Sequence, residues 1–571
     1  MQIDMWTTHS LDKLFPESER PPGAGQTISL KAARNETEDA QVVVRIPKGT
    51  EIASASFSLP ELVRAEGGVI PKEHLSASWI WYTYVLSNPP QNRDPSSYLR
   101  KAPAFFPDAF LEDREIRIRD EWTQPLWVSV RVPEGTPAGE YRGDVEVHLV
   151  EKEGGEHTLR VPITLMVWPF TLPAKGHLHH TEWYEAESLA QYYRLEPWSE
   201  AHWQWIERMA ADMAAHRQDM FLTHLTELVR VKRTKTGDLS FDFSRFDRWV
   251  RTFREAGLDW IEGSWAATRV AGFRSQIVWQ RFPVYGPDGE TRDESIEKLS
   301  HGEFETYAEQ FLKAVYTHLR RQGWDKQYVQ HISDEPVPEN KDDWCRCAGK
   351  VREWLPGVPI IDAVMSEGLE GYIDWRVPQI QHTGPEVPRH ESEELWSYVC
   401  LEPQGQYPNR FLDYPSIRNR IIFWLSWSLG LKGFLHWGYN YWVPWEGVPA
   451  RIPVSPWLDA TGASIYCADR EPLPAGDPHI VYPGEKQICS SIRWEVVRKG
   501  LEDFEYLYLL EHAVESAPSG RDQEVAAARE LLERVRGEIA RDPLNHTRDD
   551  AALLSVREEA GELLSLLAAE D

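Results

Sequence analysis

The sequence contains few cysteines and no metal-binding arrangement of them. Its 571 residues include five cysteines, an odd number, at spacings that match no metal-ligand motif. A disulfide framework is therefore not expected, which is typical of a protein from a reducing compartment. The opening residues, MQIDMWTTHS, lack a basic segment followed by an apolar one, and no apolar run approaches the length of a membrane span. These absences predict a cytoplasmic protein.

Basic residues are also scarce. The chain has 62 lysines and arginines against 90 acidic residues, a formal net charge of -28. Such a chain repels nucleic acid and anionic membranes, which argues against both as partners. The sequence is compatible with a homodimer but requires none. At this length, two or three domains are expected.

The first 170 residues have the pattern of antiparallel β structure. Leu126, Val128, Val130 and Val132 alternate with other residues at a period of two, and glycines and prolines separate this stretch from the next. Several strands without intervening helices predict a β-sandwich over residues 1–170.

Over residues 177–490 the pattern changes to strands separated by helical segments. The expected strands are residues 177–183, 220–225, 258–263, 328–333, 360–364, 377–381, 396–399 and 434–437. Eight strands separated by helices predict a (β/α)₈ barrel. Residues 491–571 carry helical apolar stripes and predict a helical segment packed on that barrel. The predicted fold class is thus multidomain α/β.

Two adjacent carboxylates follow one of these strands, in the run QYVQHISDEPVPEN at residues 327–340. Val329 belongs to the apolar part of the strand, and Pro336 cannot continue a sheet ladder. Asp334 and Glu335 are therefore predicted at the carboxyl end of a strand, where barrel enzymes carry their catalytic groups. The dipeptide alone is uninformative, because the chain contains it twice more.

Such a pair permits two forms of glycoside hydrolysis. Conventional enzymes place two carboxyl groups on opposite sides of the sugar, roughly 5–5.5 Å or about 6.5–9.5 Å apart. Neighbouring residues approach from the same wall, so a remote carboxylate would have to complete the pair; the candidates are Glu402, Asp413 and Glu446. Alternatively, a 2-acetamido sugar attacks its own anomeric carbon through the acetamide oxygen. One carboxylate would then orient the acetamide, and its neighbour would protonate the leaving oxygen. A charged Asp334 would help to keep Glu335 protonated.

The segment HISDEP resembles the Asp-Glu signature of glycoside hydrolase family 123, the β-N-acetylgalactosaminidases. The resemblance extends to AARNETEDAQVVV (residues 32–44), PAGEYRGDVEV, GFLHWGYNYW (433–442) and SIRWEVVRKGLEDFEYLYLLE (491–511). A more distant similarity to family 20 hexosaminidases departs at Ile332 and Ser333, where that family has two glycines. The resemblance implies a retaining, exo-acting β-N-acetylgalactosaminidase without metal or organic cofactor. In it, Asp334 would orient the acetamido group and Glu335 would be the general acid/base.

Six further residues are candidates for binding the sugar. Tryptophan, of which the chain has 26, offers a broad apolar face to the C–H faces of sugar rings. The candidates follow or belong to expected strands: Trp437, Tyr398, His224, Asn440, Tyr441 and Trp265. His177, His179 and His180 show no partnering acid or cysteine spacing, so no zinc site is expected.

The residues leave several alternatives open. They do not distinguish a substrate with terminal β-linked GalNAc from one with GlcNAc, because that choice depends on contacts to one hydroxyl group. They also do not identify the aglycone. A barrel glycosidase for a non-acetamido sugar, or a carbohydrate-binding protein without catalysis, remains an alternative.

Overall fold

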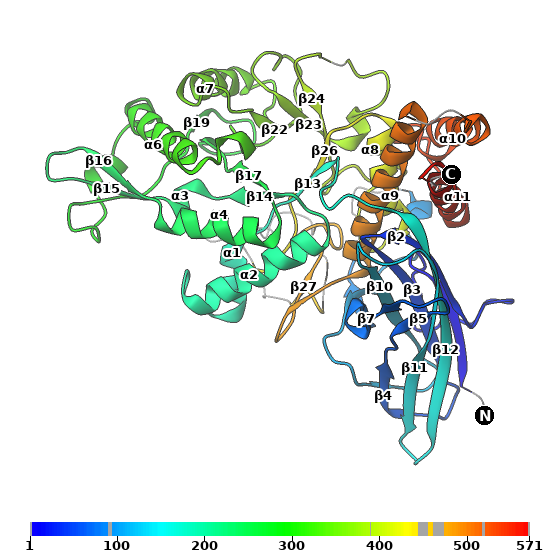
Figure 1. Ribbon diagram of the computed structural model, residues 1–571. Coiled ribbons are helices and arrows are strands. Elements are labelled where there is room, and N and C mark those ends of the chain that lie inside the picture. The colour runs from blue at the N-terminus through cyan, green and yellow to red at the C-terminus, as the bar shows by residue number, and fades with distance from the viewer. Residues whose placement is uncertain are drawn as a thin grey trace.

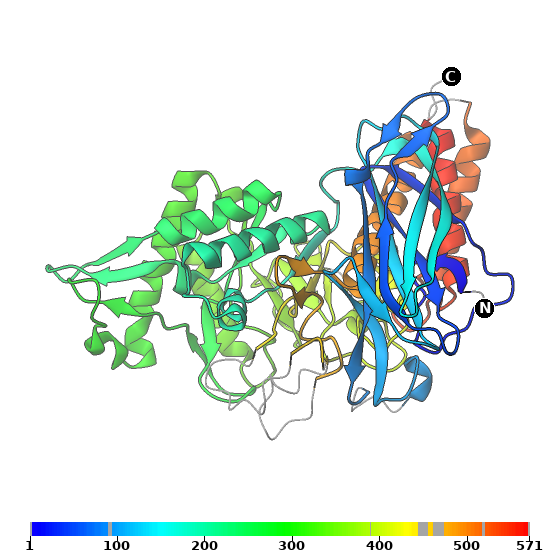
Figure 2. The same cartoon turned by 90° about the horizontal axis from the view of Figure 1, so that it is seen from below.

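The computed structural model describes residues 3–88, 94–388, 390–443, 455–458, 460, 473–516 and 520–568. An N-terminal β-sandwich, a central ring of strands with surrounding helices, and a C-terminal group of helices follow one another along the chain (Figures 1 and 2). In the part of the chain described, no helix combines the length and apolar character needed to cross a membrane.

The sandwich consists of two sheets. The first contains, in spatial order, β1 (Asp4–His9), β3 (Glu36–Arg45), β10 (Thr123–Val132), β7 (Leu75–Val85) and β8 (Ala104–Phe110). The second contains β2 (Ile28–Arg34), β12 (Glu156–Thr171), β11 (Gly139–Glu151), β4 (Ile52–Ser58) and β9 (Ile116–Ile118), with β5 (Leu62–Arg64) and β6 (Val69–Ile70) beside β11. The pair of β2 and β12 is parallel and the other pairs are antiparallel. The predicted antiparallel sandwich is confirmed.

Strand β10 is buried on both faces. Leu126 and Val128 belong to the core between the two sheets, as the alternating pattern predicted. Trp127 and Ser129 point the other way, and both donate hydrogen bonds to the buried carboxylate of Asp39. This outer face is covered because α9 (Ile492–Ser516) lies against the first sheet (Figure 1).

Eight parallel strands form the central ring. They are β13 (His179–Glu182), β14 (Met220–Thr223), β17 (Trp260–Gly263), β21 (Tyr328–Gln330), β22 (Ile361–Val364), β23 (Trp375–Pro378), β25 (Ser397–Tyr398) and β26 (Gly433–His436). Parallel ladders join β14–β17–β21, β22–β23 and β25–β26–β13. Single parallel bridges, at Gln330 with Ile360 and at Gln379 with Tyr398, connect these groups. The N–H of Asp219 beside β14 donates to β13 at 3.4 Å and closes the ring. All eight predicted strands are present, and the fold class is confirmed.

Helices cover the ring incompletely. The helices are α1 (Ala186–Tyr193), α2 (Glu200–Ala215), α3 (Leu225–Leu228), α4 (Ser244–Ala256), α5 (Glu294–Glu297), α6 (His301–Gln322), α7 (Lys341–Trp354) and α8 (Ile417–Ser428). Residues 365–374, between β22 and β23, form no helix, and the helical structure of the described residues between β23 and β25 is limited to the 3₁₀ turn η4 (Ile380–His382). The prediction of a helix after every strand is wrong here. Gly368 and Gly371 adopt positive φ angles of 81° and 80°, which interrupt a helix in so short a connection.

Further short strands lie in the loops that connect the ring strands and helices. They are β15 (Arg230–Arg233), β16 (Leu239–Asp242), β18 (Ala267–Arg269), β19 (Ile277–Trp279), β20 (Val284–Tyr285), β27 (Tyr482–Pro483) and β28 (Ile488–Cys489). β24 (Glu394–Leu395) instead pairs in parallel with β23 and belongs to the ring.

The C-terminal helices connect the other two parts. After α9 come α10 (Asp522–Arg534), the π-helical turn η5 (Val535–Ile539) and α11 (Asp550–Ala568). α9 packs on α8 beside the ring and on β3 and β8 of the sandwich, and α11 packs on α9 and β12 (Figures 1 and 2). These helices therefore contact the sandwich as well as the barrel. The domain boundaries at residues 170, 177 and 490 stay a prediction.

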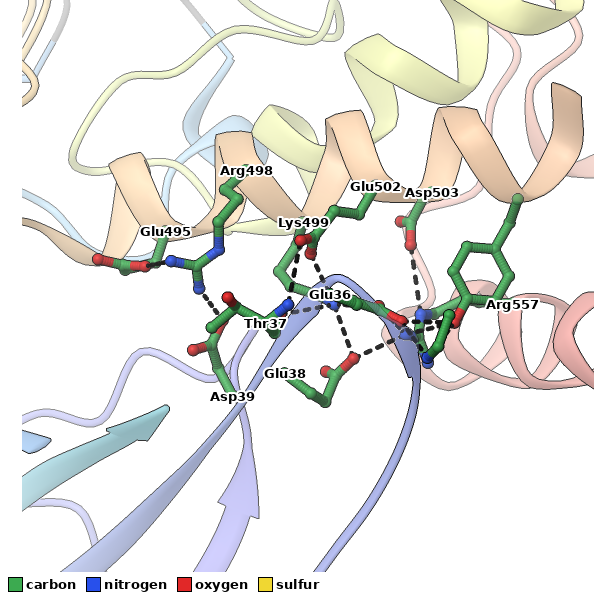
Figure 3. A network of polar contacts seen from close by, with 12 residues as sticks. Glu36, Thr37, Glu38, Asp39, Glu495, Arg498, Lys499, Glu502, Asp503 and Arg557 are labelled. Atoms are coloured by element: carbon green, nitrogen blue, oxygen red, sulfur yellow. Dashed lines mark hydrogen bonds and ion pairs between the residues drawn. The ribbon is translucent and has the colours of Figure 1, made fainter. Parts of the chain in front are cut away.

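A buried network of ion pairs holds this junction together (Figure 3). Lys499 of α9 is fully buried, and its ammonium lies 2.7 Å from carboxylates of both Glu36 and Glu38 on β3 and 3.1 Å from Glu502. Arg498 donates to Asp39 at 2.7 Å. Two of the stretches that carry the family resemblance, residues 32–44 and 491–511, thus meet at a structural junction rather than at the carboxylate pair.

Candidate active site

The segment that carries the carboxylate pair is held by the neighbouring strand. β21 ends at Gln330, three residues earlier than the predicted strand 328–333. It ends there because a carboxylate oxygen of Asp362, on β22, accepts the N–H groups of Ile332 and Ser333, both at 3.0 Å. These side-chain bonds replace a sheet ladder, and the chain leaves the ring at its carboxyl end, as predicted.

The backbone at the pair itself is strained and supported. Glu335 has a φ of 43°, which is uncommon for a residue with a side chain, and its N–H donates to the carbonyl of Ala363 at 3.0 Å. Arg269, from β18, donates from Nη2 to the carbonyl oxygens of Asp334 and Glu335, at 2.5 and 2.7 Å. Its guanidinium also packs over the ring of Phe273, 4.3 Å from the centroid. Arg269 therefore fixes the turn that presents both carboxylates.

Both carboxylates open into a cavity of about 310 Å³, a volume at the lower end for small-ligand sites. Its lining residues are Trp183, Trp265, Asp334, Glu335, Ala363, Tyr398, Cys400, Leu401, Leu435, Trp437 and Tyr441. Six residues predicted as catalytic or sugar-binding are thus brought together. A larger cavity of about 580 Å³ lies at the junction of the sandwich with α9 and contains none of the predicted site residues.

Aromatic side chains form two walls of the smaller cavity. Trp183 and Trp265 meet edge to face, with ring centroids 5.1 Å apart. Trp437 and Tyr441 form a second pair, with centroids 5.0 Å apart and planes tilted by 49°. Broad apolar faces in a small cavity suit the C–H faces of a single sugar ring. Whether these residues bind sugar stays a prediction.

The pKa of Asp334 is raised to about 8. Burial is the main cause, and the neighbouring carboxylates of Glu335 and Asp362 add repulsion. The positive charges of Arg269 and His331 act in the opposite direction without cancelling it. Two acids in such close contact titrate as a pair, so the pair holds a proton near neutral pH.

The pKa of Glu335 is raised as well, again chiefly by burial. Here the hydroxyl of Tyr398 donates to Oε1 of Glu335 and favours the charged form, with Arg269 acting in the same direction. The sequence predicted a charged Asp334 beside a protonated Glu335. In the structure the pKa values of both acids are raised, and the Tyr398 hydroxyl opposes the rise at Glu335.

Two of the predicted sugar-binding residues do not line the cavity. Asn440 is fully buried, and its side-chain amide binds the main chain of Glu185 through bonds of 2.8 and 3.0 Å. Its amide is thereby occupied in fixing the loop after β13. His224 lies beside Trp265, with ring centroids 6.5 Å apart. Burial would lower the pKa of His224, but the carboxylates of Glu185 and Glu227 raise it.

The candidate remote carboxylates do not line the cavity either. Asp413 is fully buried and accepts a hydrogen bond from the Asn88 amide at 2.7 Å. Glu402 accepts the N–H of Gln404 at 3.1 Å. Glu446 lies outside the described residues. Among the described residues that line the cavity, Asp334 and Glu335 are therefore the sole carboxylates.

The three histidines at the start of the ring, which the sequence showed without partners, have acidic partners in the structure. The pairs are His177 with Glu505 (2.7 Å), His179 with Asp219 (2.6 Å) and His180 with Glu182 (3.3 Å). Each histidine thus has a different carboxylate. Among the described residues, His9, Asp12 and Asp550 bring possible metal-ligand atoms within 4.8 Å of one another, and none of them lines the cavity.

Sequence reasoning missed several residues around the pair: Trp183, Glu262, Arg269, His331 and Asp362. Three of them carried a signal. Glu262 and Asp362 are charged residues inside strands predicted to be buried, which usually indicates a partner. Trp183 ends a predicted strand at the catalytic end of the ring. Arg269 carried no such signal, because its loop position depends on tertiary structure.

Comparisons with known proteins match most of the chain to one family. The family model described as "Glycoside hydrolase 123, catalytic domain" matches residues 183–510, and the model of the glycoside hydrolase 123 N-terminal domain matches residues 8–149. The chain matches the structure of a family 123 glycoside hydrolase from Clostridium perfringens, studied for glycolipid glycan hydrolysis, at 16% identity and a TM-score of 0.70. That match covers 99% of this chain and 98% of the other.

Matches to other barrel enzymes are weak. The endo-β-1,4-mannanase from Thermotoga petrophila has a TM-score of 0.31 at 9% identity, covering 58% of this chain and 77% of its own. A glycoside hydrolase family 5 protein from Bacteroides vulgatus has a TM-score of 0.27 at 11% identity, covering 48% and 60%. Likeness at this level carries no argument about this chain. No curated protein matches the sequence.

Proposed function

We propose that this chain, which belongs to glycoside hydrolase family 123, releases terminal β-linked N-acetylgalactosamine with retention of configuration, by substrate-assisted catalysis. The observation that carries the proposal is the cavity with two adjacent carboxylates and, among its described lining residues, no third. A conventional double displacement needs carboxyl groups on both sides of the sugar. A nucleophile supplied by the substrate removes that need.

In the proposed reaction Asp334 accepts the acetamide N–H and orients the acetamide oxygen toward the anomeric carbon. Glu335 donates its proton to the glycosidic oxygen as the bond from that oxygen to the anomeric carbon breaks. The electron pair leaves with the oxygen, and the acetamide oxygen bonds to the anomeric carbon, giving an oxazoline-type intermediate. Water then attacks that carbon and gives its proton to Glu335, while the bond from the acetamide oxygen to the anomeric carbon breaks and its electron pair returns to the acetamide. Two inversions at one carbon retain the configuration.

Substrate binding would also move the proton within the pair. In the structure the Tyr398 hydroxyl favours a charged Glu335. When that hydroxyl turns to the acetamide oxygen, Glu335 loses its donor while Asp334 gains the acetamide N–H. Both changes favour a charged Asp334 and a protonated Glu335, the state that the reaction requires.

The test is hydrolysis of aryl β-GalNAc, β-GlcNAc and β-galactoside by the wild type, by Glu335→Gln, and by Glu402→Gln as a matched control. The proposal predicts cleavage of β-GalNAc, none of the galactoside, loss in Glu335→Gln and full activity in Glu402→Gln. Equal cleavage of the galactoside would contradict substrate assistance. Loss of activity in Glu402→Gln would support a conventional mechanism in which Glu402 is the remote carboxylate. Sugar binding by the wild type without turnover would favour a carbohydrate-binding protein.

A further inference from the structure

A buried histidine lies between two carboxylates directly behind the proposed catalytic pair. His331 Nδ1 is 2.7 Å from Asp362, and Nε2 is 2.6 Å from Glu262. All three side chains are fully buried. They come from three neighbouring positions of the ring: Glu262 from β17, His331 just after β21, and Asp362 from β22.

The hydrogen-bond pattern determines the charge of this triad. Each carboxylate also accepts from other donors: Glu262 from Thr181 (2.6 Å) and Trp183 Nε1 (2.7 Å), and Asp362 from Ile332, Ser333 and Trp344 Nε1 (2.8 Å). Both carboxylates therefore accept hydrogen bonds from several donors besides His331. A neutral imidazole has one N–H and could donate to one of them only. His331 satisfies both as an imidazolium.

The two ends of the triad reach different parts of the cavity. Glu262 Oε1 accepts both His331 and the indole N–H of Trp183, a wall of the cavity. Asp362 accepts both His331 and the backbone N–H groups that immediately precede Asp334. His331 is thus connected through Glu262 to Trp183 on one side, and through Asp362 to the turn that carries Asp334 and Glu335 on the other.

From this arrangement we infer that His331 is a positioning residue, which fixes Trp183 through Glu262 and the Asp334–Glu335 turn through Asp362. The inference rests on the proposed function in so far as it takes Asp334 and Glu335 as the catalytic pair. His331 does not line the cavity, so its effect on the reaction is indirect.

The electrostatics agree with this role. Burial alone would lower the pKa of His331, but the hydrogen bonds and charges of Asp362 and Glu262 raise it to about 10. Its charge also acts on Asp334 and lowers the pKa of that carboxyl against the larger effect of burial. The carboxylates that contact the imidazolium are Glu262 from β17 and Asp362 from β22, and with both beside it His331 stays charged across the neutral range.

The experiment uses three near-isosteric variants of the full chain, with His318→Gln as the matched control. His318 is also buried and 2.6 Å from a carboxylate, that of Asp247, but lies on the outer helices α6 and α4. Glu262→Gln is expected to raise KM about tenfold with little change in kcat, because the Trp183 wall is released. Asp362→Asn is expected to lower kcat about a hundredfold with little change in KM, because the turn is released. His331→Gln is expected to show both effects.

A second readout does not depend on activity. The ¹⁵N–H resonance of the Trp183 indole, assigned with Trp183→Phe, is expected to shift in Glu262→Gln and His331→Gln but not in His318→Gln. If His331→Gln lowers the unfolding temperature like His318→Gln while kcat, KM and the indole resonance stay at wild-type values, the inference is overturned. If the wild type cleaves no glycoside, the proposed function fails, and the indole resonance alone decides on the bracing of Trp183.

Discussion

The junction of the sandwich with α9 and the cavity both contain buried carboxylates, but the directions of their pKa shifts differ. At the junction the direction also varies between residues, because burial raises the pKa of Asp39 to about 6 although Arg498 opposes the rise. At the junction of the sandwich with α9, burial would raise the pKa of Glu495, but Arg498 and His216 lower it to about 2. The pKa of Glu36 is also lowered, by Arg557 and Lys499 against burial. In the cavity, burial and neighbouring acids raise the pKa of Asp334 to about 8. The direction of each shift follows from the balance between burial, which raises the pKa of a carboxyl, and nearby cations, which lower it.

The cations differ in what they bind. At the junction Lys499 contacts three carboxylates directly (Figure 3). In the cavity Arg269 donates to the main-chain carbonyls of Asp334 and Glu335 and leaves their carboxylates without an ion pair among the described residues. The junction therefore pairs its acids with buried cations. The cavity keeps a proton available for chemistry.

The largest expected effect distinguishes a catalytic role of Glu335 from a structural one. Glu335→Gln should lower kcat by about 10²–10⁴-fold, the usual contribution of a general acid/base. The unfolding temperature should not fall, because the variant removes a buried group whose pKa is raised. Steady-state kinetics and thermal unfolding of the same preparation measure both. A parallel fall in stability would mean that Glu335 has a structural role like that of the junction acids.

Removing the shared cation of the junction should lower stability and leave kcat unchanged. Lys499→Met leaves Glu36, Glu38 and Glu502 buried without their shared cation, and should lower the free energy of unfolding by about 3–5 kcal/mol. Kcat per folded molecule should stay unchanged, because none of these residues lines the catalytic cavity. Urea unfolding and active-site-normalised kinetics measure the two quantities. Unchanged stability would show that the network is not needed to hold the junction.

The pH dependence of stability should differ between the two clusters. A carboxyl whose pKa is raised in the folded state stabilises the fold below its ordinary pKa near 4 and loses this contribution as the pH rises through about 8. Asp334→Asn should therefore gain about 2 kcal/mol relative to the wild type between pH 5 and pH 9. The stabilising contribution of Glu495 changes with pH in the opposite direction. It is present at neutral pH and is lost in acid, as the pH falls toward 2. Urea unfolding at both pH values measures the gain, and an equal difference at pH 5 and pH 9 would contradict the raised pKa.

A smaller effect concerns the proton donor. Tyr398→Phe removes the hydroxyl that favours the charged form of Glu335, so the pKa of Glu335 should rise further. The alkaline limb of the profile of kcat/KM against pH should move to higher pH, with about a tenfold loss of kcat. The profile measured from pH 4 to pH 10 tests this. An alkaline limb that stays in place would mean that this bond does not set the protonation of Glu335.

Local patterns predicted much of the fold and the centre of the site. The period-two alternation gave the sandwich, and eight apolar segments gave the eight strands of the ring. The apolar run that ends before Asp334 and Glu335 was enough to place the pair at the carboxyl end of a strand. The helices expected after β22 and β23 are absent because glycines with positive φ interrupt one short connection, which composition alone does not reveal.

The rest of the site depends on contacts between distant residues. Arg269 approaches Asp334 across 65 positions, and His331 approaches Glu262 across 69. Asn440 looked like a sugar ligand because it follows a ring strand, yet its amide binds the chain at Glu185, 255 positions away. A single sequence gives residue types and spacing, and these pairings arise from tertiary structure.

The most direct test of substrate assistance is kcat/KM for aryl β-GalNAc substrates whose acetamido group carries zero, one, two or three fluorine atoms. Fluorine withdraws electrons from the acetamide oxygen and makes it a poorer nucleophile. The account predicts a steep fall with each fluorine, with the trifluoro substrate slower by several orders of magnitude. Equal rates across the series would contradict it, because the nucleophile would then have to come from the protein or from water.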